Sequence, residues 1–179
     1  MKKFLKVIGI ILLLIIAFVL IAGIFVSKTY HIEKDITINA SRDTVWNNLS
    51  SLQAMMKWSP WTDADPNVQV SYEGQEGAVG SLYRWKGNKQ VGSGNQTITK
   101  IDKPSRIETH LNFIEPFSGE ADAYLNLGDA GNGTKVTWGF DTKYPYPMNV
   151  MTLFINMDEM MGKQYNTGLE RLKKLSESH

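Results

Sequence analysis

The spacing of hydrophobic residues divides the chain into three segments. An unbroken apolar run covers residues 7–26, a two-residue alternation dominates 68–143, and a helical spacing runs from Val150 to Leu172. Alternation is typical of strands with one buried face, whereas a spacing of three to four residues is typical of amphipathic helices. The pattern therefore predicts an apolar helix, a run of antiparallel strands and a long C-terminal helix.

A further strand and helix are expected before the main run of strands. Ile32, Ile36 and Ile38 share a parity, which predicts a strand with one buried face. Ser41 is placed to cap a helix, because its hydroxyl can accept a hydrogen bond from a free amide of the first turn. The apolar residues from Val45 to Leu52 recur at helical spacing and predict a helix of about three turns.

About six consecutive antiparallel strands are expected between Val68 and Lys143. Asn132-Gly133 is a strong hairpin signal within this segment. In the final helix, Gly162 and Gly168 each cost about 1 kcal/mol relative to alanine. A close approach of this helix to the sheet or to a ligand would explain why glycine is tolerated there.

The apolar run 7–26 contains no charged residue, amide or proline. As a helix it would extend about 30 Å, which matches the hydrocarbon core of a bilayer. It lacks the polar face of a core helix. A cleavable signal usually has about 7–15 apolar residues followed by small residues, whereas here Ala22 and Gly23 are followed by further large apolar residues. The favoured interpretation is an uncleaved transmembrane signal anchor.

Charges around this helix predict its orientation. Lysines at positions 2, 3 and 6 precede it, whereas only Lys28 and Lys34 follow closely. The excess in front places the N-terminus in the cytoplasm and the domain on the extracytoplasmic side. The expected organisation is a cytoplasmic N-terminus (1–6), a transmembrane helix (7–26), a connector (27–31) and a ligand-binding domain (32–176). So short a connector would hold the domain near the bilayer surface.

The remainder of the chain is close to neutral and has no cysteine. Beyond the three leading lysines it carries 16 basic and 18 acidic residues, which gives no electrostatic reason to expect nucleic acid or anionic lipid as the partner. The lack of cysteine excludes disulfides, thiol catalysis and a lipoprotein anchor, and it removes most structural zinc sites. We expect no cofactor and no bound metal.

The order strand, helix, six strands and long helix is similar to the helix-grip fold of the START-like, or SRPBCC, superfamily. The resemblance to its polyketide cyclase/dehydrase-type branch covers roughly residues 32–175. It implies an α+β fold in which a curved antiparallel sheet of about seven strands surrounds a long C-terminal helix and leaves a cavity. The superfamily includes lipid carriers, hormone receptors, aromatic-ring cyclases and chaperone-ATPase activators, so the resemblance bears on fold more than on function. The segments that carry it are Trp58-Ser59-Pro60-Trp61, Ser81–Ile101, Gly131–Asp141 and Met157–Met161.

The titratable residues suggest no catalytic constellation. The parity of His110 places it on the solvated face of its strand, whereas a general base needs a partner and a position facing the cavity. The segment 63–67 begins like a calcium loop, but Val68 and Gly74 stand where such a loop needs glycine and glutamate. Asp158 and Glu159 are expected on the polar side of the last helix. We therefore predict no catalytic residue, although enzymatic activity stays open.

Aromatic and apolar residues form the candidate site. They lie on loops and strand faces that should point toward the last helix. Aromatic rings combine area with a polar handle, and methionine adapts to varied shapes; ligand pockets of about 300–1,000 Å³ are lined in this way. The alternative is that the same residues simply fill a core. The predicted ligand-cavity residues are Trp58, Trp61, Tyr72, Tyr83, Trp85, Leu111, Phe113, Leu125, Trp138, Phe140, Met157 and Met161.

Three functions follow from this interpretation. The favoured one is a membrane-tethered domain that binds or transfers a hydrophobic small molecule or lipid in an internal cavity, because the tether would raise the local concentration of a membrane-dissolved ligand. The second is a cyclase/dehydratase-type enzyme acting on an apolar substrate, which requires a titratable group inside the cavity. The third is a ligand-free interaction module with a closed core and an exposed apolar patch. The sequence identifies no protein partner.

Overall fold

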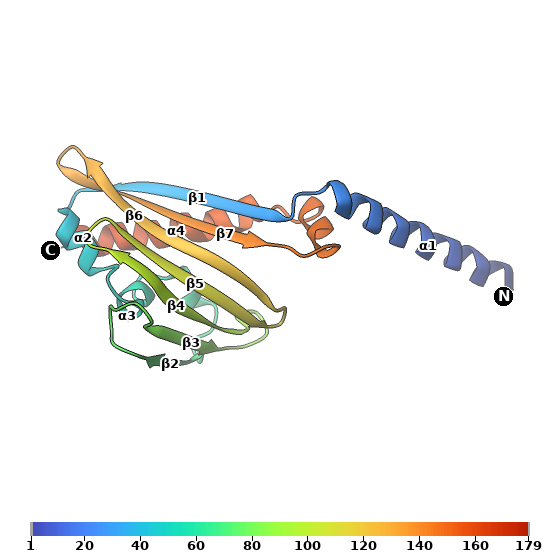
Figure 1. The fold of residues 1–179 in the computed structure, drawn as a ribbon, viewed down its shortest axis with the longest axis horizontal. Coiled ribbons are helices and arrows are strands. Elements are labelled where there is room, and N and C mark those ends of the chain that lie inside the picture. The colour runs from blue at the N-terminus through green and yellow to red at the C-terminus, as the bar shows by residue number, and fades with distance from the viewer. Residues whose placement is uncertain (1, 179) are drawn as a thin grey trace.

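The computed structural model describes residues 2–178 and has a curved antiparallel sheet, a long helix packed on its concave face and a separate N-terminal helix (Figure 1). The seven strands are arranged in the order β1-β7-β6-β5-β4-β3-β2. This confirms the predicted α+β helix-grip architecture. The strands are β1 (Thr29–Ile38), β2 (Gln69–Glu73), β3 (Leu82–Lys86), β4 (Ser93–Asp102), β5 (Arg106–Glu115), β6 (Gly119–Ala130) and β7 (Gly133–Lys143). The helices are α1 (Lys2–Phe25), α2 (Arg42–Asn47), α3 (Leu52–Met56), η1 (Pro60–Asp63), η2 (Met148–Leu153) and α4 (Met157–Glu177).

The two-residue alternation correctly predicts which face of the sheet is buried. On β6, Leu125 and Leu127 are buried while the residues between them are more exposed. On β7, Val136, Trp138 and Phe140 are buried on the same face. Register pairs Leu125 with Trp138 across the two strands, so these side chains form one continuous apolar surface under α4.

The first helical segment is shorter than the sequence predicts. Instead of one helix of about three turns, the chain forms α2 and α3, separated by a turn at 48–51. Two serines explain the break, because each caps its own helix. Ser41 Oγ accepts from the amide of Thr44 at 3.2 Å, as predicted, and Ser51 Oγ accepts from the amide of Ala54 at 3.1 Å.

The long C-terminal stripe of apolar residues also divides into two elements. Residues before 154 form the 3₁₀ helix η2, and α4 begins only at Met157. Asn156 terminates the stripe because its Oδ1 accepts from the amide of Glu159 at 3.1 Å, which caps α4. Met151 therefore lies in η2 and is 47% exposed.

The N-terminal apolar helix is confirmed and projects away from the sheet (Figure 1). Of its described residues only Gly23 is buried. The connector is shorter than the predicted 27–31, because β1 begins at Thr29 and pairs with Lys143. His31, assigned to the connector from the sequence, instead lies within β1. The start of the sheet therefore follows the end of α1 almost directly.

The two glycines of α4 lie where the helix crosses the sheet. A Cβ at Gly168 would lie 2.8 Å from Trp138 Cζ3 and 3.1 Å from Pro60 Cδ. Such distances require the neighbours to move, so glycine is needed for this close approach, as the sequence predicts. A Cβ at Gly162 would meet mainly the flexible end of Lys34, at 3.2 Å from its Cε.

This contrast predicts opposite effects of two alanine substitutions in one helix. Gly168→Ala should lower the free energy of unfolding by about 1–2 kcal/mol, because the strain of overpacking against Trp138 exceeds the gain in helix propensity. Gly162→Ala should raise it by about 0.5–1 kcal/mol, because Lys34 can move aside. Thermal unfolding of the full chain in a mild detergent, followed by circular dichroism, measures both. Stabilisation by Gly168→Ala would contradict the close packing of α4.

Candidate functional site

Four aromatic side chains fill one half of the space between α4 and the sheet. Tyr165 of α4 stacks on Trp138 of β7, with ring centroids 4.0 Å apart and an interplanar angle of 26°. Trp58 and Trp61 meet Trp138 edge-on at 5.1 and 5.6 Å. The indole Nε1 of Trp58 donates to the carbonyl of Asn48 at 2.9 Å. Such edge-on and stacked pairs add to the energy of burial, so this half is firmly packed around Trp138, and only Trp61 of the four reaches solvent.

The other half of the concave surface carries a second aromatic group, named here the aromatic face, which consists of Tyr72, Tyr83, Trp85 and Phe113. Successive ring centroids lie 5.2, 5.8 and 6.0 Å apart across β2, β3 and β5. The rest of the protein covers the aromatic face only in part, because Tyr72 is 38% exposed and Trp85 and Phe113 are only partly buried. The aromatic face therefore offers apolar surface to a ligand over several adjacent rings.

Gly94 of β4 creates the room in which Trp85 lies. It pairs with Trp85 on one side and with Phe113 on the other. A Cβ at Gly94 would lie only 2.5 Å from Cζ2 of the Trp85 ring. The indole therefore lies across the glycine, which brings it to Phe113 on the far side of β4. Glycine at this position is a condition for a continuous aromatic surface over three strands.

A polar pair on the concave surface is missing from the sequence prediction. Gln96 Nε2 donates to Thr109 Oγ1 at 2.9 Å, and Thr109 is buried. In register, Gln96 lies between Tyr83 and Leu111. The sequence could have indicated this pair, because Gln96 and Ile98 are two residues apart in β4 and so share the inward face. This pair supplies hydrogen-bonding capacity beside the aromatic face.

Two buried tyrosine rings, of Tyr83 and Tyr165, carry hydroxyl oxygens that water or a ligand can reach, because neither oxygen is a fully enclosed atom without a partner. Tyr165 is 1% exposed and Tyr83 is 7% exposed. Within residues 2–178 neither hydroxyl makes a hydrogen bond to another protein group. Burial raises the pKa of Tyr83 to about 12 and also raises the pKa of Tyr165. Both phenols therefore stay protonated at neutral pH and can donate to a polar atom of a ligand or to water.

The predicted ligand-cavity residues differ in how far the structure buries them. The structure brings most of them to the concave surface, while Trp61 and Tyr72 extend toward solvent at 40% and 38% exposure. Ligand contact at these positions stays a prediction. Fully buried are Trp58, Tyr83, Leu125, Trp138 and Phe140, and partly buried are Trp85, Leu111, Phe113, Met157 and Met161.

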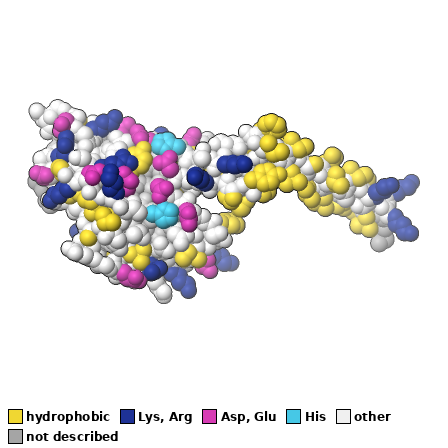
Figure 2. All heavy atoms as spheres, viewed as in Figure 1, with side chains coloured by type: hydrophobic (Ala, Val, Ile, Leu, Met, Phe, Trp, Pro, Cys, Tyr) yellow, Lys and Arg dark blue, Asp and Glu magenta, His cyan; other side chains and the backbone are white. Residues whose placement is uncertain are grey.

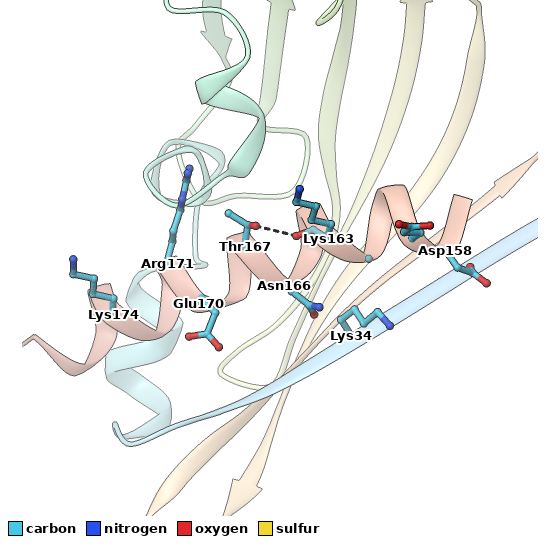
Figure 3. Close-up of a pocket in the computed structure, with 10 residues that line it drawn as sticks. Lys34, Asp158, Lys163, Asn166, Thr167, Glu170, Arg171 and Lys174 are labelled. Atoms are coloured by element: carbon cyan, nitrogen blue, oxygen red, sulfur yellow. Dashed lines mark hydrogen bonds between the residues drawn. The ribbon is translucent and has the colours of Figure 1, made fainter. Parts of the chain in front are cut away.

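A groove of about 840 Å³ runs along the opposite, solvent-facing side of α4 (Figure 3). Its lining is polar and differs in character from the predicted apolar cavity. Thr167 Oγ1 donates to the carbonyl of Lys163 at 2.9 Å, and Arg171 pairs with Asp63 of η1. The groove is lined by Lys34, Asp158, Glu159, Gly162, Lys163, Asn166, Thr167, Glu170, Arg171 and Lys174.

The two histidines of the sheet lie on its outer surface. His31 Nδ1 is 2.8 Å from Asp141 Oδ1, and His110 Nδ1 is 2.8 Å from Asp122 Oδ1. Figure 2 shows these histidines beside acidic side chains on the exposed side. The predicted solvated position of His110 is confirmed. No group of three His, Asp or Glu side chains placed to hold a metal occurs among residues 2–178.

Asp65 is the buried acidic residue of the described chain, and its loop explains its burial. Its Oδ1 accepts from the amide of Asn67 at 2.9 Å, and its Oδ2 accepts from the amide of Asn88 at 2.7 Å. The carboxylate thereby joins the loop before β2 to the β3–β4 turn. This agrees with the interpretation of segment 63–67 as turn acids, since the oxygens serve backbone amides of the protein.

The buried phenol of Tyr83 predicts a specific loss of stability at high pH. An unfolded tyrosine ionises near pH 10, whereas Tyr83 ionises near pH 12 when folded. The unfolded state therefore loses its proton first, and the stabilisation is complete below pH 10 and lost as the pH rises to about 12. The difference corresponds to about 2–3 kcal/mol. Denaturation of wild type and Tyr83→Phe across this range should give a shallower decline for the variant; equal slopes would contradict the burial of this phenol.

Comparison with known proteins assigns the chain to a family. A family model described as polyketide cyclase/dehydrase and lipid transport matches residues 29–177. A search of curated protein sequences finds no significant match.

Solved structures share the fold at low sequence identity. Ara h 8.0201 superposes with a TM-score of 0.56 at 12% identity, over 84% of this chain and 99% of its own. The Mll3558 protein from Rhizobium loti gives 0.59 at 16% identity, over 82% and 96%. The di-domain ARO/CYC BexL from the BE-7585A biosynthetic pathway gives 0.59 at 11% identity, over 85% of this chain and 51% of its own. These structures show the same fold, and the family model covers nearly the whole domain, so the chain belongs to the polyketide cyclase/dehydrase and lipid transport family.

Proposed function

We propose that this chain is a membrane-anchored domain that binds or transfers a hydrophobic small molecule or lipid between its sheet and α4. The observation that carries the proposal is the aromatic face together with the unpartnered hydroxyl of Tyr83 at its centre. The oxygen of this hydroxyl is not fully enclosed by protein, so it can donate a hydrogen bond to a polar atom that approaches the aromatic face. A ligand with an apolar body and a polar atom would satisfy both features at once.

The same surface suggests how such a ligand would be oriented. Rings of the aromatic face provide area for stacking, and Met161 packs at the edge of the core, where its flexible side chain can adjust. Gln96 and Thr109 already form one hydrogen bond with each other, but amide and hydroxyl groups each retain further capacity. The polar part of the ligand would lie toward this pair and Tyr83, and its apolar part toward Trp85. This division is typical of small-molecule sites.

The domain binds the end of α1 through side-chain hydrogen bonds, which supports a retained anchor. The last carbonyls of a helix lack intrahelical partners. Asn149 Nδ2 donates to the carbonyls of Gly23 at 2.8 Å and Val26 at 2.9 Å, and Tyr146 Oη donates to that of Leu20 at 3.1 Å. A Cβ at Gly23 would lie 2.9 Å from the Tyr146 ring. Contacts between the domain and α1 can stabilise the protein only if the apolar helix is not cleaved off. They therefore support α1 as a retained transmembrane anchor.

Binding is favoured over catalysis by the position of the titratable groups. An enzyme of the cyclase/dehydratase type needs an acid or base beside the substrate. The His31–Asp141 and His110–Asp122 pairs lie on the outer surface of the sheet, on the side away from α4. Near the aromatic face, the carboxylate of Glu76 lies close enough to Tyr72 to help raise the pKa of its phenol. The inward-facing polar groups there are the phenol of Tyr83 and the Gln96–Thr109 pair, which can orient a ligand.

Native mass spectrometry of the full chain released from detergent micelles should detect a co-purifying hydrophobic molecule. Tyr83→Phe should reduce the bound fraction by about ten-fold through the loss of one buried hydrogen bond, and Trp85→Ala should reduce it at least as much. Tyr124→Phe is the matched control, because Tyr124 lies on the outer surface, where its hydroxyl donates to Glu33 at 2.6 Å. Wild-type protein without a ligand in repeated preparations, or an equal loss in all three variants, would contradict the proposed site.

The orientation of the anchor can be tested with single cysteines, because the natural chain has none. Ser71 is exposed on the edge strand β2, and Lys3 is exposed before the apolar run. In intact cells a membrane-impermeant maleimide should label Ser71→Cys, while Lys3→Cys should react only after permeabilisation. The reverse pattern would place the domain in the cytoplasm.

A further inference from the structure

Large apolar side chains are exposed at the end of the domain next to α1. We name this group the apolar end. Phe154 is 74% exposed, Leu153 55% and Phe117 69%. Most of these residues lie in and around η2, which contacts α1, and the others lie in the β5–β6 turn at the same end of the sheet (Figure 1). The apolar end consists of Ile114, Phe117, Tyr146, Met148, Met151, Leu153, Phe154 and Ile155.

The strand register shows that the η2 segment and the β5–β6 turn lie at the same end of the sheet. Thr29 pairs with Lys143, and Ala121 pairs with Thr142, so the start of β6 lies beside the point where the chain leaves β7 for η2. The β5–β6 turn, which contains Phe117, therefore projects in the same direction as the segment after Lys143. The β2–β3 loop, with exposed Val79, lies at the opposite end of the strands.

Hydrogen bonds fix the depth of the apolar end relative to α1. Tyr146 reaches the carbonyl of Leu20, and Asn149 reaches that of Val26. Six residues of helix span about 9 Å, so this segment lies beside the last turns of the apolar helix and overlaps it along the axis. Amphipathic segments at bilayer surfaces bury their apolar side by about 5–10 Å. If α1 spans the bilayer, η2 lies at that depth.

The composition of residues 144–156 is also suited to the interface of a bilayer. Residues 144–156 contain no charged side chain. Tyr144 and Tyr146 are of the type enriched at membrane interfaces. Lys28 and Lys143 flank the segment, and the Lys28 ammonium lies 6.0 Å from the centre of the Tyr146 ring. Their positions beside the exposed apolar residues are suitable for contact with lipid phosphates.

We propose that the apolar end inserts into the interfacial layer of the bilayer that α1 spans. The inference rests on the proposed anchoring and adds a second membrane contact, which holds the domain with this end against the lipid. A groove of about 470 Å³ opens there, and it is bordered by Tyr30, the segment 152–156, Met157 and Asp158, whose Oδ1 accepts from the Tyr30 hydroxyl at 3.0 Å. Insertion places this groove at the boundary of the hydrocarbon, so a lipid-like ligand would enter the domain from the bilayer at the start of α4.

A bilayer fits the apolar end better than a protein partner because the end is continuous with α1. The exposed residues adjoin the end of α1, since residues 144–156 are uncharged and Asn149 is buried against α1. A separate protein binding this surface would also have to enter the lipid alongside the helix. The bilayer covers both surfaces with one apolar phase.

Depth-dependent fluorescence quenching in vesicles tests the proposal on the full chain. Single-cysteine variants Phe154→Cys and Val79→Cys, each labelled with a nitrobenzoxadiazole dye, are reconstituted in phosphatidylcholine vesicles with and without doxyl-labelled lipid. The two positions are matched, because both are exposed apolar residues, at opposite ends of the sheet. We expect about three-fold or greater quenching at position 154 relative to position 79, together with a blue-shifted emission. Leu14→Cys, within α1, reports on the anchor itself.

The outcomes separate the two proposals. Quenching at positions 14 and 154 but not at 79 supports insertion. Quenching at 14 with equal, low values at 154 and 79 overturns insertion and leaves the anchor intact. Absence of quenching at 14 overturns the anchor and, with it, the insertion. As a second measurement, Leu153→Asp combined with a dye at Met151→Cys should lose most of the quenching seen at position 151 alone; retained quenching would contradict a role for this surface.

Discussion

The stacking of Tyr165 on Trp138 fixes how α4 lies on the sheet, and the other features depend on it. The stack requires the backbone of α4 to approach β7 closely, which is possible because Gly168 has no side chain. Trp58 then closes this half edge-on. With α4 held over β1 and β7, the β2–β5 part of the concave surface is less covered, and the aromatic face stays accessible. One tightly packed contact thus creates both a stable core and an incompletely filled region beside it.

Much of the fold could be predicted because local pattern and tertiary burial agree. Alternation identified the strands, and Asn132-Gly133 identified the β6–β7 hairpin. The helix boundaries were wrong at two places, where the apolar spacing continues through a break. Ser51 and Asn156 each cap a new helix, yet apolar residues recur at helical spacing on both sides of each cap, so periodicity alone cannot locate the break.

The site was predictable in its residue types and less so in its geometry. Parity placed Tyr83 and Trp85 on the inner face, but their cover depends on where α4 crosses, which no local pattern contains. The Gln96–Thr109 contact arises from the register of β4 with β5, including an irregularity between Ile98 and Lys100. Register is a property of paired strands. The hydrogen bond from Asn149 to the end of α1 joins residues more than a hundred positions apart, which no local sequence pattern can indicate.

The hydrogen bonds between Asn149, Tyr146 and the end of α1 have a mechanical consequence. A helix whose apolar length differs from the local bilayer thickness responds by tilting. β1 follows α1 after only a few residues, and side chains of the domain hydrogen-bond to carbonyls at the end of α1. The helix and the domain are therefore joined without a flexible linker. If α1 spans a bilayer, as proposed above, a change in membrane thickness would therefore rotate the whole sheet relative to the membrane plane. The junction at Gly23 would then couple the angle of the domain to the thickness of the bilayer.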